Sequence, residues 1–431
     1  MNKFLNKHYL QIKKGGIRVL FIKFFSLLLI IPSYLISIPI SLIIIIIKPL
    51  VLIRFKELHS SRIGHFSADT ELYCCEKDAK INLPNKIYKD IFYFKKFVCN
   101  KFLARMWKRK LIILPNWLLK PLHNMIIIYC KLFNLKNEHE ITSPINSDRD
   151  IFNLYEKFKP HIEFSIDEEN KGKSILKQFG LSENSKFVSL VVRDSGYLNR
   201  YLENYEIGKW DYHSYRNGDI DNYILAAEEL ASRGYYVFRL GTNVLKPIKS
   251  SNPKIIDYSN SKLRSEFMDI YISAKCHFCL TTGVGIDGVS SVFRRPIACV
   301  HVPLGLSLYT NNKNHLLLTK HHINKLSKKE LTISEIFSSN VALSTSSTDF
   351  LDNDVELVEN TSEEIKDFAI EMDQRLNNEW KDTNEDKENQ KKFWQIFEDN
   401  LKKLNTNEKL HGKIYAKFSS NYLRKNKDWI K

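Results

Sequence analysis

The sequence predicts an α/β fold built around a doubly wound parallel sheet. Its second half alternates short apolar runs with segments in which apolar residues recur at helical spacing. In the helical segment 219–233, Asp219 can cap the start and Gly234 can end the helix. Strands that are apolar almost throughout, and that alternate strictly with helices, are typical of a parallel sheet. The predicted strands are Phe187–Arg193, Tyr235–Leu240, Lys254–Ile256, Cys276–Thr281 and Pro296–His301, and the other predicted helices are Leu263–Ala274 and Ile286–Phe293.

The first half predicts a smaller α/β domain and the C-terminal part a helical tail. Leu50–Phe55 is a short apolar run that favours a buried strand, and the polar turn His59–His65 leads from it into a helix. Residues 80–140 are predicted to be largely helical. In the charged tail, Thr361 and Glu364 have the spacing of a capping box.

A membrane anchor is predicted near the N-terminus. The segment Phe24–Ile47 contains no charged residue, and a helix of that length can cross a hydrocarbon core of about 30 Å. Pro32 and Pro39 interrupt it, and basic residues flank both ends, which places both flanks on the cytoplasmic face. These observations favour a re-entrant or monotopic anchor; a single span and a buried helix of a soluble protein are the alternatives. The flanking basic residues are Lys3, Lys7, Lys13, Lys14, Arg18 and Lys23 before the segment and Lys48, Arg54 and Lys56 after it.

The formal net charge of +16 favours anionic partners, namely membrane lipids or phosphorylated substrates. A general richness in Lys, Ile and Asn is the alternative source of the charge. No Lys/Arg block is interleaved with aromatic residues and no zinc-finger pattern occurs, so nucleic acid is not an expected partner. The seven cysteines are scattered, which favours a reducing compartment over a disulfide framework. No metal site is expected, because Cys276 and Cys279 lie within a predicted strand.

Two groups of candidate site residues follow predicted strands of the second half. Arg193 leaves its strand at the carboxyl edge, where it can meet a phosphate, with Asp194 beside it as a base or an orienting group; a structural ion pair is the alternative. Thr281, Thr282 and Gly283 form a turn whose small residues and helix N-terminus suit an anion, although an ordinary turn explains them equally well. Asp287, at the start of the next helix, weakens the anion-binding interpretation.

Two further groups lie in loops. Arg62, Gly64 and His65 follow the first predicted strand, and histidine is the usual proton shuttle near neutral pH. The segment Asp211–Asn217 is dense in hydrogen-bonding and aromatic groups that suit a sugar or a nucleobase, among them His213 and Arg216. A polar surface loop is the alternative for both.

Several motifs occur in an order that resembles a family of bacterial glycosyltransferases. The family is similar, more distantly, to GT-B transferases, in which two Rossmann-like domains face each other across a cleft. The motifs are SSRIGH (Ser60–His65), RDSGYL (Arg193–Leu198), DYHSYRN (Asp211–Asn217), RLG (Arg239–Gly241), IDYSNSKLRSEFMDIYISA (Ile256–Ala274), FRRP (Phe293–Pro296) and ELVENTSEEI (Glu356–Ile365).

The resemblance covers roughly residues 57–380, and together with the patterns described above it divides the chain into four expected parts. They are a basic N-terminus with a hydrophobic membrane anchor (1–48), an acceptor-side α/β domain (49–165), a nucleotide-sugar-binding α/β domain (166–345) and a charged helical tail (346–431).

The resemblance also implies roles for the candidate residues. His65 or Asp194 would be the catalytic base. Donor contacts would come from Arg193, Arg239, Thr281, Thr282 and Gly283, and Arg62 would face the acceptor together with His65. The composition of the two loops adds Gly64, Asp211, His213 and Arg216 as candidate contacts to the acceptor or the sugar.

These expectations describe an enzyme of the cytoplasmic face of the bacterial inner membrane. It would transfer a sugar from a nucleotide-sugar to a cell-surface glycan or lipid-linked acceptor, without a cofactor and without a metal, since basic groups neutralise the diphosphate. The alternatives are a catalytically inactive membrane-associated scaffold of glycan assembly and a nucleotide-dependent phosphotransferase. The lack of a P-loop disfavours the phosphotransferase.

Overall fold

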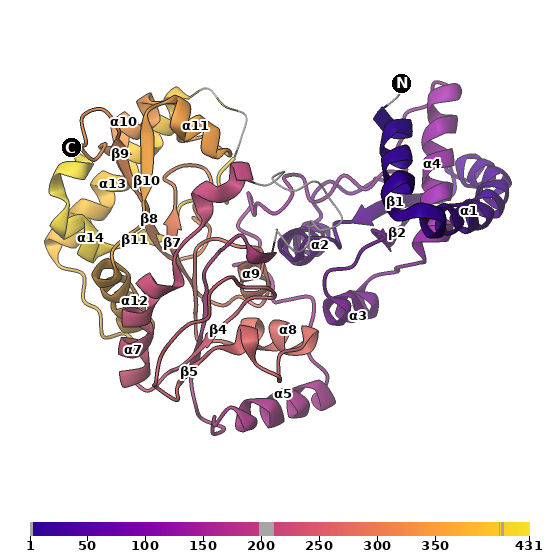
Figure 1. Cartoon of the computed structure of the whole chain (residues 1–431). Helices are drawn as coiled ribbons and strands as arrows, with labels where there is room; N and C mark the ends of the chain where they lie inside the picture. Colours follow the sequence, from indigo (N-terminus) through magenta and orange to yellow (C-terminus); the bar gives the residue numbers. More distant parts are fainter. Residues whose placement is uncertain (1–2, 198–210, 405, 407–408) are drawn as a thin grey trace. The chain divides into compact units, whose positions relative to one another are not determined.

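The computed structural model describes residues 3–197, 211–404, 406 and 409–431 (Figure 1). The chain forms two compact units. The first unit comprises residues 1–61, 82–99 and 107–142, and the second comprises residues 62–81, 100–106 and 143–431. Leu198, the last residue of the RDSGYL motif, lies outside the described residues.

The second unit is built on a seven-stranded sheet in which every neighbouring pair of strands is parallel. The predicted α/β fold with a parallel sheet is therefore confirmed. Its strand order is β11-β8-β7-β6-β3-β4-β5. The strands are β3 (Phe187–Val191), β4 (Tyr236–Arg239), β5 (Ile255–Ile256), β6 (Cys279–Thr281), β7 (Ile297–Val302), β8 (Leu316–Thr319) and β11 (Lys417–Phe418).

The chain changes direction across this sheet between β3 and β6. From β3 it adds β4 and β5 towards one edge, and then returns to add β6, β7 and β8 on the other side of β3. Such a switch point opens a crevice at the carboxyl ends of the two strands. The residues that follow β3 and β6 therefore lie next to each other, at the carboxyl ends of two adjacent central strands.

Helices pack around this sheet (Figure 1). In chain order they are α2 (Ile63–Asp78), α5 (Ile166–Gln178), α7 (Ile224–Ser232), α8 (Glu266–Lys275), α9 (Asp287–Val292), α10 (Ile333–Ser338), α11 (Ser347–Asp352), α12 (Ser362–Leu376), α13 (Asn384–Lys403) and α14 (Ser420–Lys425). Among these, α7 packs against α12, α8 against α9, and α13 against α14. A short antiparallel pair, β9 (His321–Asn324) with β10 (Val355–Val358), joins them.

Local capping follows the sequence closely. Asp219 accepts a hydrogen bond from the Asp221 backbone N–H at 3.0 Å, although the helix it caps begins as the 3₁₀ turn η3 (Ile220–Tyr223) before α7. Thr361 and Glu364 form the predicted capping box at the start of α12. The C-terminal tail is more than a helical extension, because β11 adds a strand to the edge of the main sheet.

The first unit contains α1 (Lys3–Ile46), α4 (Asn116–Leu132) and a parallel pair of strands, β1 (Leu52–Leu58) and β2 (Tyr88–Phe94). The helix expected over residues 80–140 is wrong at β2, where the residues pair in parallel register with those of β1. Within the described residues this unit has only these two strands, fewer than a complete Rossmann-like sheet. Its core consists of Ile44, Phe55, Tyr93, Leu119, Leu122, Ile126 and Cys130.

Helix α1 covers the segment predicted as a membrane anchor. It is kinked at Gly16, where φ is 59°, and it contains Pro32 and Pro39. In the part of the chain that the structure describes, no helix combines the length and the apolar character needed to cross a membrane.

The compact units differ from the expected domains 49–165 and 166–345. Helix α2 and the segment 143–165 belong to the unit that holds the large sheet. The reason is packing, because α2 lies along α9, which follows β6 of that sheet. Helix α3 (Lys101–Lys110) contains the point where the chain passes from the second unit back to the first.

Candidate active site

The turn after β6 is shaped by its own side chains. Gly283 has φ of +71°, a conformation that favours glycine, and its backbone N–H donates to Thr281 Oγ1 at 3.1 Å. Thr281 Oγ1 donates in turn to Asp287 Oδ2 at 2.9 Å, and the Val284 N–H donates to the same carboxylate oxygen at 2.8 Å. Burial raises the pKa of Asp287 to about 6. Thr281 and Asp287 therefore face inward and hold the turn.

Arg193 follows β3 and is held beside this turn. Its backbone N–H donates to Thr282 Oγ1 at 3.0 Å, and its carbonyl accepts from the Gly218 N–H at 2.9 Å. Burial, and then the neighbouring charge of Arg216, lower the pKa of Arg193 to about 10. The backbone contacts thus hold Arg193 beside the turn, and its largely buried guanidinium has the cationic Arg216 as a neighbour.

Arg216 brings a second guanidinium to the same turn. It lies in η2 (Asp211–Arg216) and donates a hydrogen bond to the Gly283 carbonyl. Among the described residues, no carboxylate lies within ion-pair distance of Arg193 or Arg216. The charge of Arg62 acts on the same histidine, His213, as the charges of Arg193 and Arg216 do. We call these three arginines the arginine cluster.

The pKa of His213 reports the field of this cluster. Burial lowers it, and the charges of Arg193, Arg216 and Arg62 lower it further, to about 4. The imidazole is therefore neutral at physiological pH. The share of this lowering that comes from the guanidinium charges reflects a positive potential, and such a potential favours an anion.

The loop that carries His213 and Arg216 is held from two sides. Ser347 Oγ of α11 accepts from the Tyr215 N–H at 3.0 Å and donates to the Tyr212 carbonyl at 3.0 Å. On the other side, the buried Lys320 Nζ donates to the Asn217 carbonyl at 2.6 Å. Asp211, at the start of η2, is exposed.

Gly218 lets this loop lie directly over the ends of the strands. A Cβ atom at Gly218 would lie 3.2 Å from His301 Nδ1 and 3.5 Å from Thr282 Cγ2. The contact is close enough that a side chain would push the loop, and the arginine that it carries, away from the turn.

A second constellation lies at the start of α2. His65 Nδ1 is 3.2 Å from Asp69 Oδ1, one helical turn further on, and 3.5 Å from Ser147 Oγ. The hydrogen bond to Asp69 raises the pKa of His65 although burial opposes it, and the nearby Asp148 raises it further. This is the geometry of a histidine base whose ring is oriented by a carboxylate.

The backbone contact between α2 and the β6 turn brings the two constellations together. A Cβ atom at Gly64 would lie 3.0 Å from Gly285 Cα, and one at Gly285 would lie 3.1 Å from the Gly64 nitrogen. Arg62, exposed before the first residue of α2, lowers the pKa of both His65 and His213. The charge of the Arg62 guanidinium thus reaches both the histidine–aspartate pair and the residues around Arg193 and Arg216.

Two of the predicted site residues, Arg239 and Asp194, make structural contacts with the backbone and with each other. The fully buried Arg239 turns back on the end of β4, where Nη1 donates to the Leu240 carbonyl at 2.6 Å. Its Nη2 lies 3.6 Å from Asp194 Oδ2. Asp194 also accepts from the backbone N–H groups of Gly196 and Leu245, at 2.9 Å each. The carboxylate is surrounded by donors that organise the loop after β3.

Sequence reasoning did not identify Asp69 and Ser147. The signal for Asp69 was available, because residues four apart share one face of a helix and His65 and Asp69 have that spacing. Ser147 is distant in sequence, so only the fold brings it to His65.

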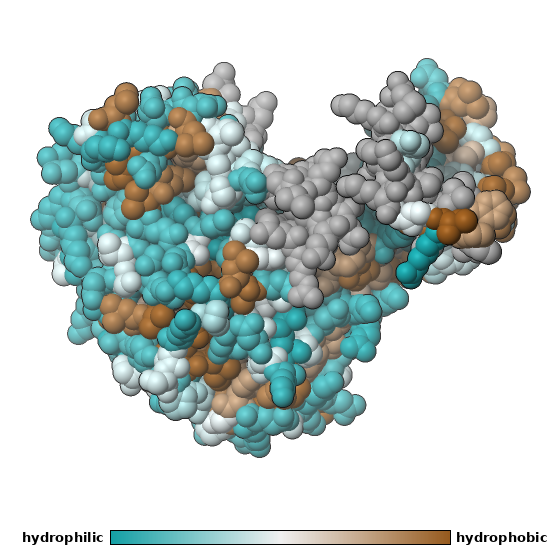
Figure 2. Space-filling view, in the orientation of Figure 1, coloured by the Kyte–Doolittle hydropathy of each residue, from teal (hydrophilic) through white to brown (hydrophobic). Residues whose placement is uncertain are grey.

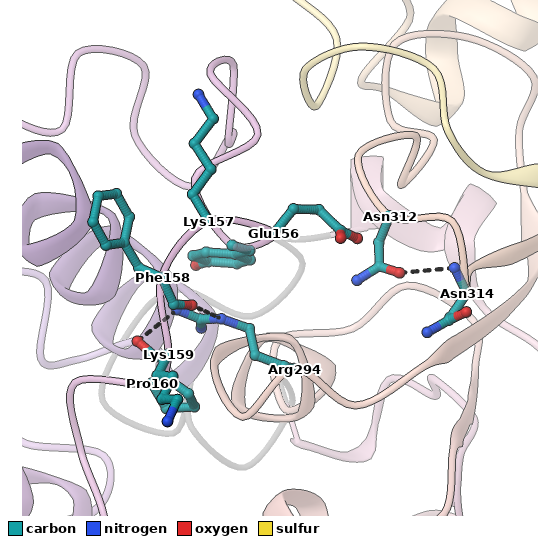
Figure 3. Close-up of a pocket in the computed structure, with 9 residues that line it drawn as sticks. Glu156, Lys157, Phe158, Lys159, Pro160, Arg294, Asn312 and Asn314 are labelled. Atoms are coloured by element: carbon teal, nitrogen blue, oxygen red, sulfur yellow. Dashed lines mark hydrogen bonds between the residues drawn. The ribbon is translucent and has the colours of Figure 1, made fainter. Parts of the chain in front are cut away.

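A separate pocket of roughly 330 Å³ lies in the second unit, bordered by residues 155–160, Arg294, Asn312 and Asn314. Figure 3 shows the Arg294 side chain turned to the backbone of Phe158 and Lys159, whose carbonyls accept at 3.0 and 3.2 Å. Arg294 also donates to Glu71 Oε1 at 2.6 Å. Its charge is therefore already neutralised, which leaves the arginine cluster as the stronger anion site.

Behind this pocket, Glu71, Cys75 and His161 bring three metal-ligand types within 4.8 Å of one another. Their donor atoms have other partners. Glu71 Oε1 accepts from Arg294 and lies 3.1 Å from His161 Nδ1, while His161 Nε2 lies 3.0 Å from Asp78 Oδ2. The group fits an ion-pair network centred on the Arg294 charge better than a metal centre.

Comparisons with known proteins add distant likenesses of fold. No protein-family model and no curated protein matches the chain. The chain is similar to the glycosyl transferase family 9 protein from Veillonella parvula DSM 2008, with a TM-score of 0.37 and 10% identity, over 62% of this chain and 85% of that one. It is also similar to ADP-heptose LPS heptosyltransferase II from E. coli, with a TM-score of 0.35 and 11% identity, over 60% of this chain and 86% of that one. The function proposed below rests on the geometry of the site.

Proposed function

We propose that this protein is a glycosyltransferase that moves a sugar from a nucleotide-sugar to a hydroxyl group of a glycan or lipid-linked acceptor. The observation that carries the proposal is the arginine cluster at the switch point of the sheet. Arg193 and Arg216 lie beside the Gly283 turn without a carboxylate partner among the described residues. Burial lowers the pKa of His213, and the charges of both arginines add to that lowering, which takes the pKa to about 4. A diphosphate supplies the negative charge that this arrangement lacks.

In this mechanism His65 is the general base. Its Nδ1 faces Asp69, so Nε2 is the nitrogen that can take a proton from the acceptor hydroxyl. The acceptor oxygen forms a bond to the anomeric carbon, the bond from that carbon to the diphosphate oxygen breaks, and the diphosphate leaves with the electron pair. Arg193 and Arg216 stabilise the charge that develops on the leaving group.

The roles of the other predicted residues follow from their contacts. Thr282 positions Arg193 through its hydroxyl, and Thr281 with Gly283 shapes the turn that receives Arg216. His213 and Asp211 lie on the loop that would contact the sugar or the nucleobase of the donor. Asp194 and Arg239 support the loop after β3, so we assign the base to His65 alone.

We also propose that transfer needs no metal and no further cofactor. The support is chemical, because two guanidinium groups supply the positive charge that a divalent cation provides in other phosphate sites.

Ligand-induced stabilisation tests donor binding directly. A nucleoside diphosphate that binds the native state should raise the melting temperature of the protein. At a ligand concentration of one hundred times Kd, the free energy of unfolding should rise by about 2.7 kcal/mol. The wild type and the control Arg233→Gln, whose guanidinium pairs with Glu229 and Asp373, should respond equally. Arg193→Gln and Arg216→Gln should not respond. EDTA should leave the response of the wild type unchanged.

Turnover separates an enzyme from an inactive scaffold. His65→Gln should keep the nucleotide-induced stabilisation but lose nucleotide release from the activated sugar. If no nucleoside diphosphate stabilises the wild type and none is released from any activated sugar, the proposed function is wrong.

A further inference from the structure

The positive charge of this protein is concentrated in its first unit. That unit contains nineteen Lys and Arg residues against four Asp and Glu residues, a difference of fifteen out of the +16 of the whole chain. The second unit, with about three quarters of the residues, is therefore almost neutral. A general lysine bias would have spread the excess over both units, so the partition points to a partner of the first unit.

Three of the four acidic residues of the first unit are paired within it. Asp90 accepts from Arg54 at 2.7 and 2.9 Å. Glu138 lies 3.1 Å from Lys48 and 3.0 Å from Lys86, and Glu57 lies 3.2 Å from Lys120. Most of the basic side chains of the unit consequently have no acidic group of their own to neutralise them.

The second part of α1 buries its serines and exposes many of its aliphatic residues, although Ile44 belongs to the core. Ser33, Ser37 and Ser41, spaced by one turn, are buried, while Leu35 is 62% and Ile46 73% exposed. The serine hydroxyls bond within the helix, Ser37 to the Ser33 carbonyl at 2.7 Å and Ser41 to the Ile38 carbonyl at 2.9 Å. Helices in water show the reverse arrangement, whereas small residues between packed helices with aliphatic residues outside are typical of a lipid environment.

Helix α4, which packs against α1, presents apolar side chains at both of its ends. Trp117 is 64% exposed near its start, and Leu132 and Phe133 are 70% and 53% exposed at its end. Exposed Lys131 and Lys136 bracket the second group. From residue 91 to residue 137 the chain contains no Asp or Glu. Figure 2 shows hydrophobic residues gathered over this part of the molecule.

We propose that the first unit docks on the surface of a bilayer that contains anionic lipids, through Leu35, Ile43 and Ile46 of α1 together with Trp117, Leu132 and Phe133 of α4 and its end. These residues are called the lipid-facing surface below. The aliphatic side chains enter the boundary between headgroups and acyl chains, and the surrounding lysines attract the headgroups. Tryptophan at such a boundary has its indole N–H among polar groups.

This inference adds α4 to the N-terminal segment as a membrane contact and does not require a helix that crosses the bilayer. It also does not depend on the proposed transfer reaction. The lipid chemistry is favoured over nucleic acid, because the exposed groups of this surface are mainly aliphatic and a nucleic-acid groove presents aromatic stacking platforms.

Vesicle flotation of the full chain tests the proposal. The probes are vesicles of phosphatidylcholine alone and of phosphatidylcholine mixed with phosphatidylglycerol. The wild type should float with the mixed vesicles, and Leu132→Asp/Phe133→Asp should reduce the bound fraction at least about tenfold. Lys131→Gln/Lys136→Gln should weaken binding to the mixed vesicles by about tenfold, and added salt should do the same.

Matched controls lie in the second unit. Leu326→Asp/Leu351→Asp introduces the same charges at residues that are 79% and 56% exposed, and Lys313→Gln/Lys387→Gln removes two exposed charges. Both should bind like the wild type. Circular dichroism should show equal folding for all variants, since every substituted residue is exposed.

Three outcomes would overturn the proposal. The wild type could fail to bind the mixed vesicles, or Leu132→Asp/Phe133→Asp could bind as well as the wild type. Sedimentation could instead show an oligomer, without vesicle binding, that the same variant converts to a monomer; a second copy of the chain would then cover this surface. Nucleotide-induced stabilisation is measured without lipid, so failure here leaves the proposed function to its own test.

Discussion

Gly64 and Gly285 meet backbone to backbone, with only 3.0 Å between the position of a Cβ on Gly64 and the Gly285 Cα. This contact holds the first turn of α2, with His65 and Asp69, against the turn that carries Gly283. Neither glycine can be replaced without movement of one of the two segments.

Gly64→Ala should therefore lower the rate of transfer by more than its loss of stability explains. The added methyl group pushes α2 from the turn, and overpacking of this kind costs about 1–3 kcal/mol. Denaturant unfolding measures the stability, and initial rates measure the transfer. If the variant keeps the full rate, the contact does not position the base.

The pH–rate profile should depend on Asp69. His65 acts as a base only when it is neutral, so the rate should fall as the pH drops through its raised pKa. Asp69→Asn removes the largest cause of that rise, so the acid limb should move to lower pH. The maximal rate should also fall, because the ring loses its orienting carboxylate. An unchanged acid limb would show that another group titrates.

Arg193→Gln should raise the pKa of His213 from about 4 towards its usual value near 6.5. Burial lowers the pKa most and remains in the variant, so the rise should be partial. Titration of the imidazole by NMR measures it directly. Arg233→Gln is the control, because its guanidinium pairs with Glu229 and Asp373 and does not contribute to the pKa of His213.

His321 should make stability depend on pH above neutrality. Burial lowers its pKa, but hydrogen bonds to Glu330 and Glu364 outweigh burial and raise the pKa to about 10; the Tyr422 hydroxyl also faces the ring. A raised folded pKa stabilises the fold fully below the unfolded value near 6.5, and the contribution disappears as the pH rises through about 10.

His321→Gln should accordingly cost on the order of 2–4 kcal/mol at pH 6 and much less near pH 10. Denaturant unfolding of the wild type and the variant across this range gives the difference. A constant difference would mean that packing, and not the charge of the imidazolium, supports β9 and α12.

Asp90→Asn should destabilise the first unit strongly. Asp90 and Arg54 are register partners on β2 and β1, and their side chains form a buried bidentate pair at 2.7 and 2.9 Å. Breaking a buried pair leaves an uncompensated charge and costs about 3–5 kcal/mol. Glu138→Gln, which breaks a more exposed pair, should cost less than about 1 kcal/mol. Equal losses in the two variants would contradict this interpretation.

The amino-acid sequence by itself predicted five of the seven strands of the large sheet, β3 to β7, and the residues that follow them; it did not predict β8 and β11. Runs such as Phe187–Val191 are apolar apart from Ser189, and only a strand covered on both sides buries such a run. It also determined the caps at Asp219 and Thr361, since capping depends on neighbouring residues alone.

The tertiary structure decided which of these residues meet. The order of the strands brings the end of β3 beside the end of β6, and a contact between two glycines adds α2 to the same edge. Arg239 ends one apolar strand and Arg193 follows another, yet Arg239 turns inward, where its guanidinium meets Asp194 and Ser259, while the backbone of Arg193 is bonded to Thr282 of the β6 turn. The +16 charge is likewise a property of composition, and the fold alone places nearly all of it on one unit, since three separate stretches of the chain assemble there.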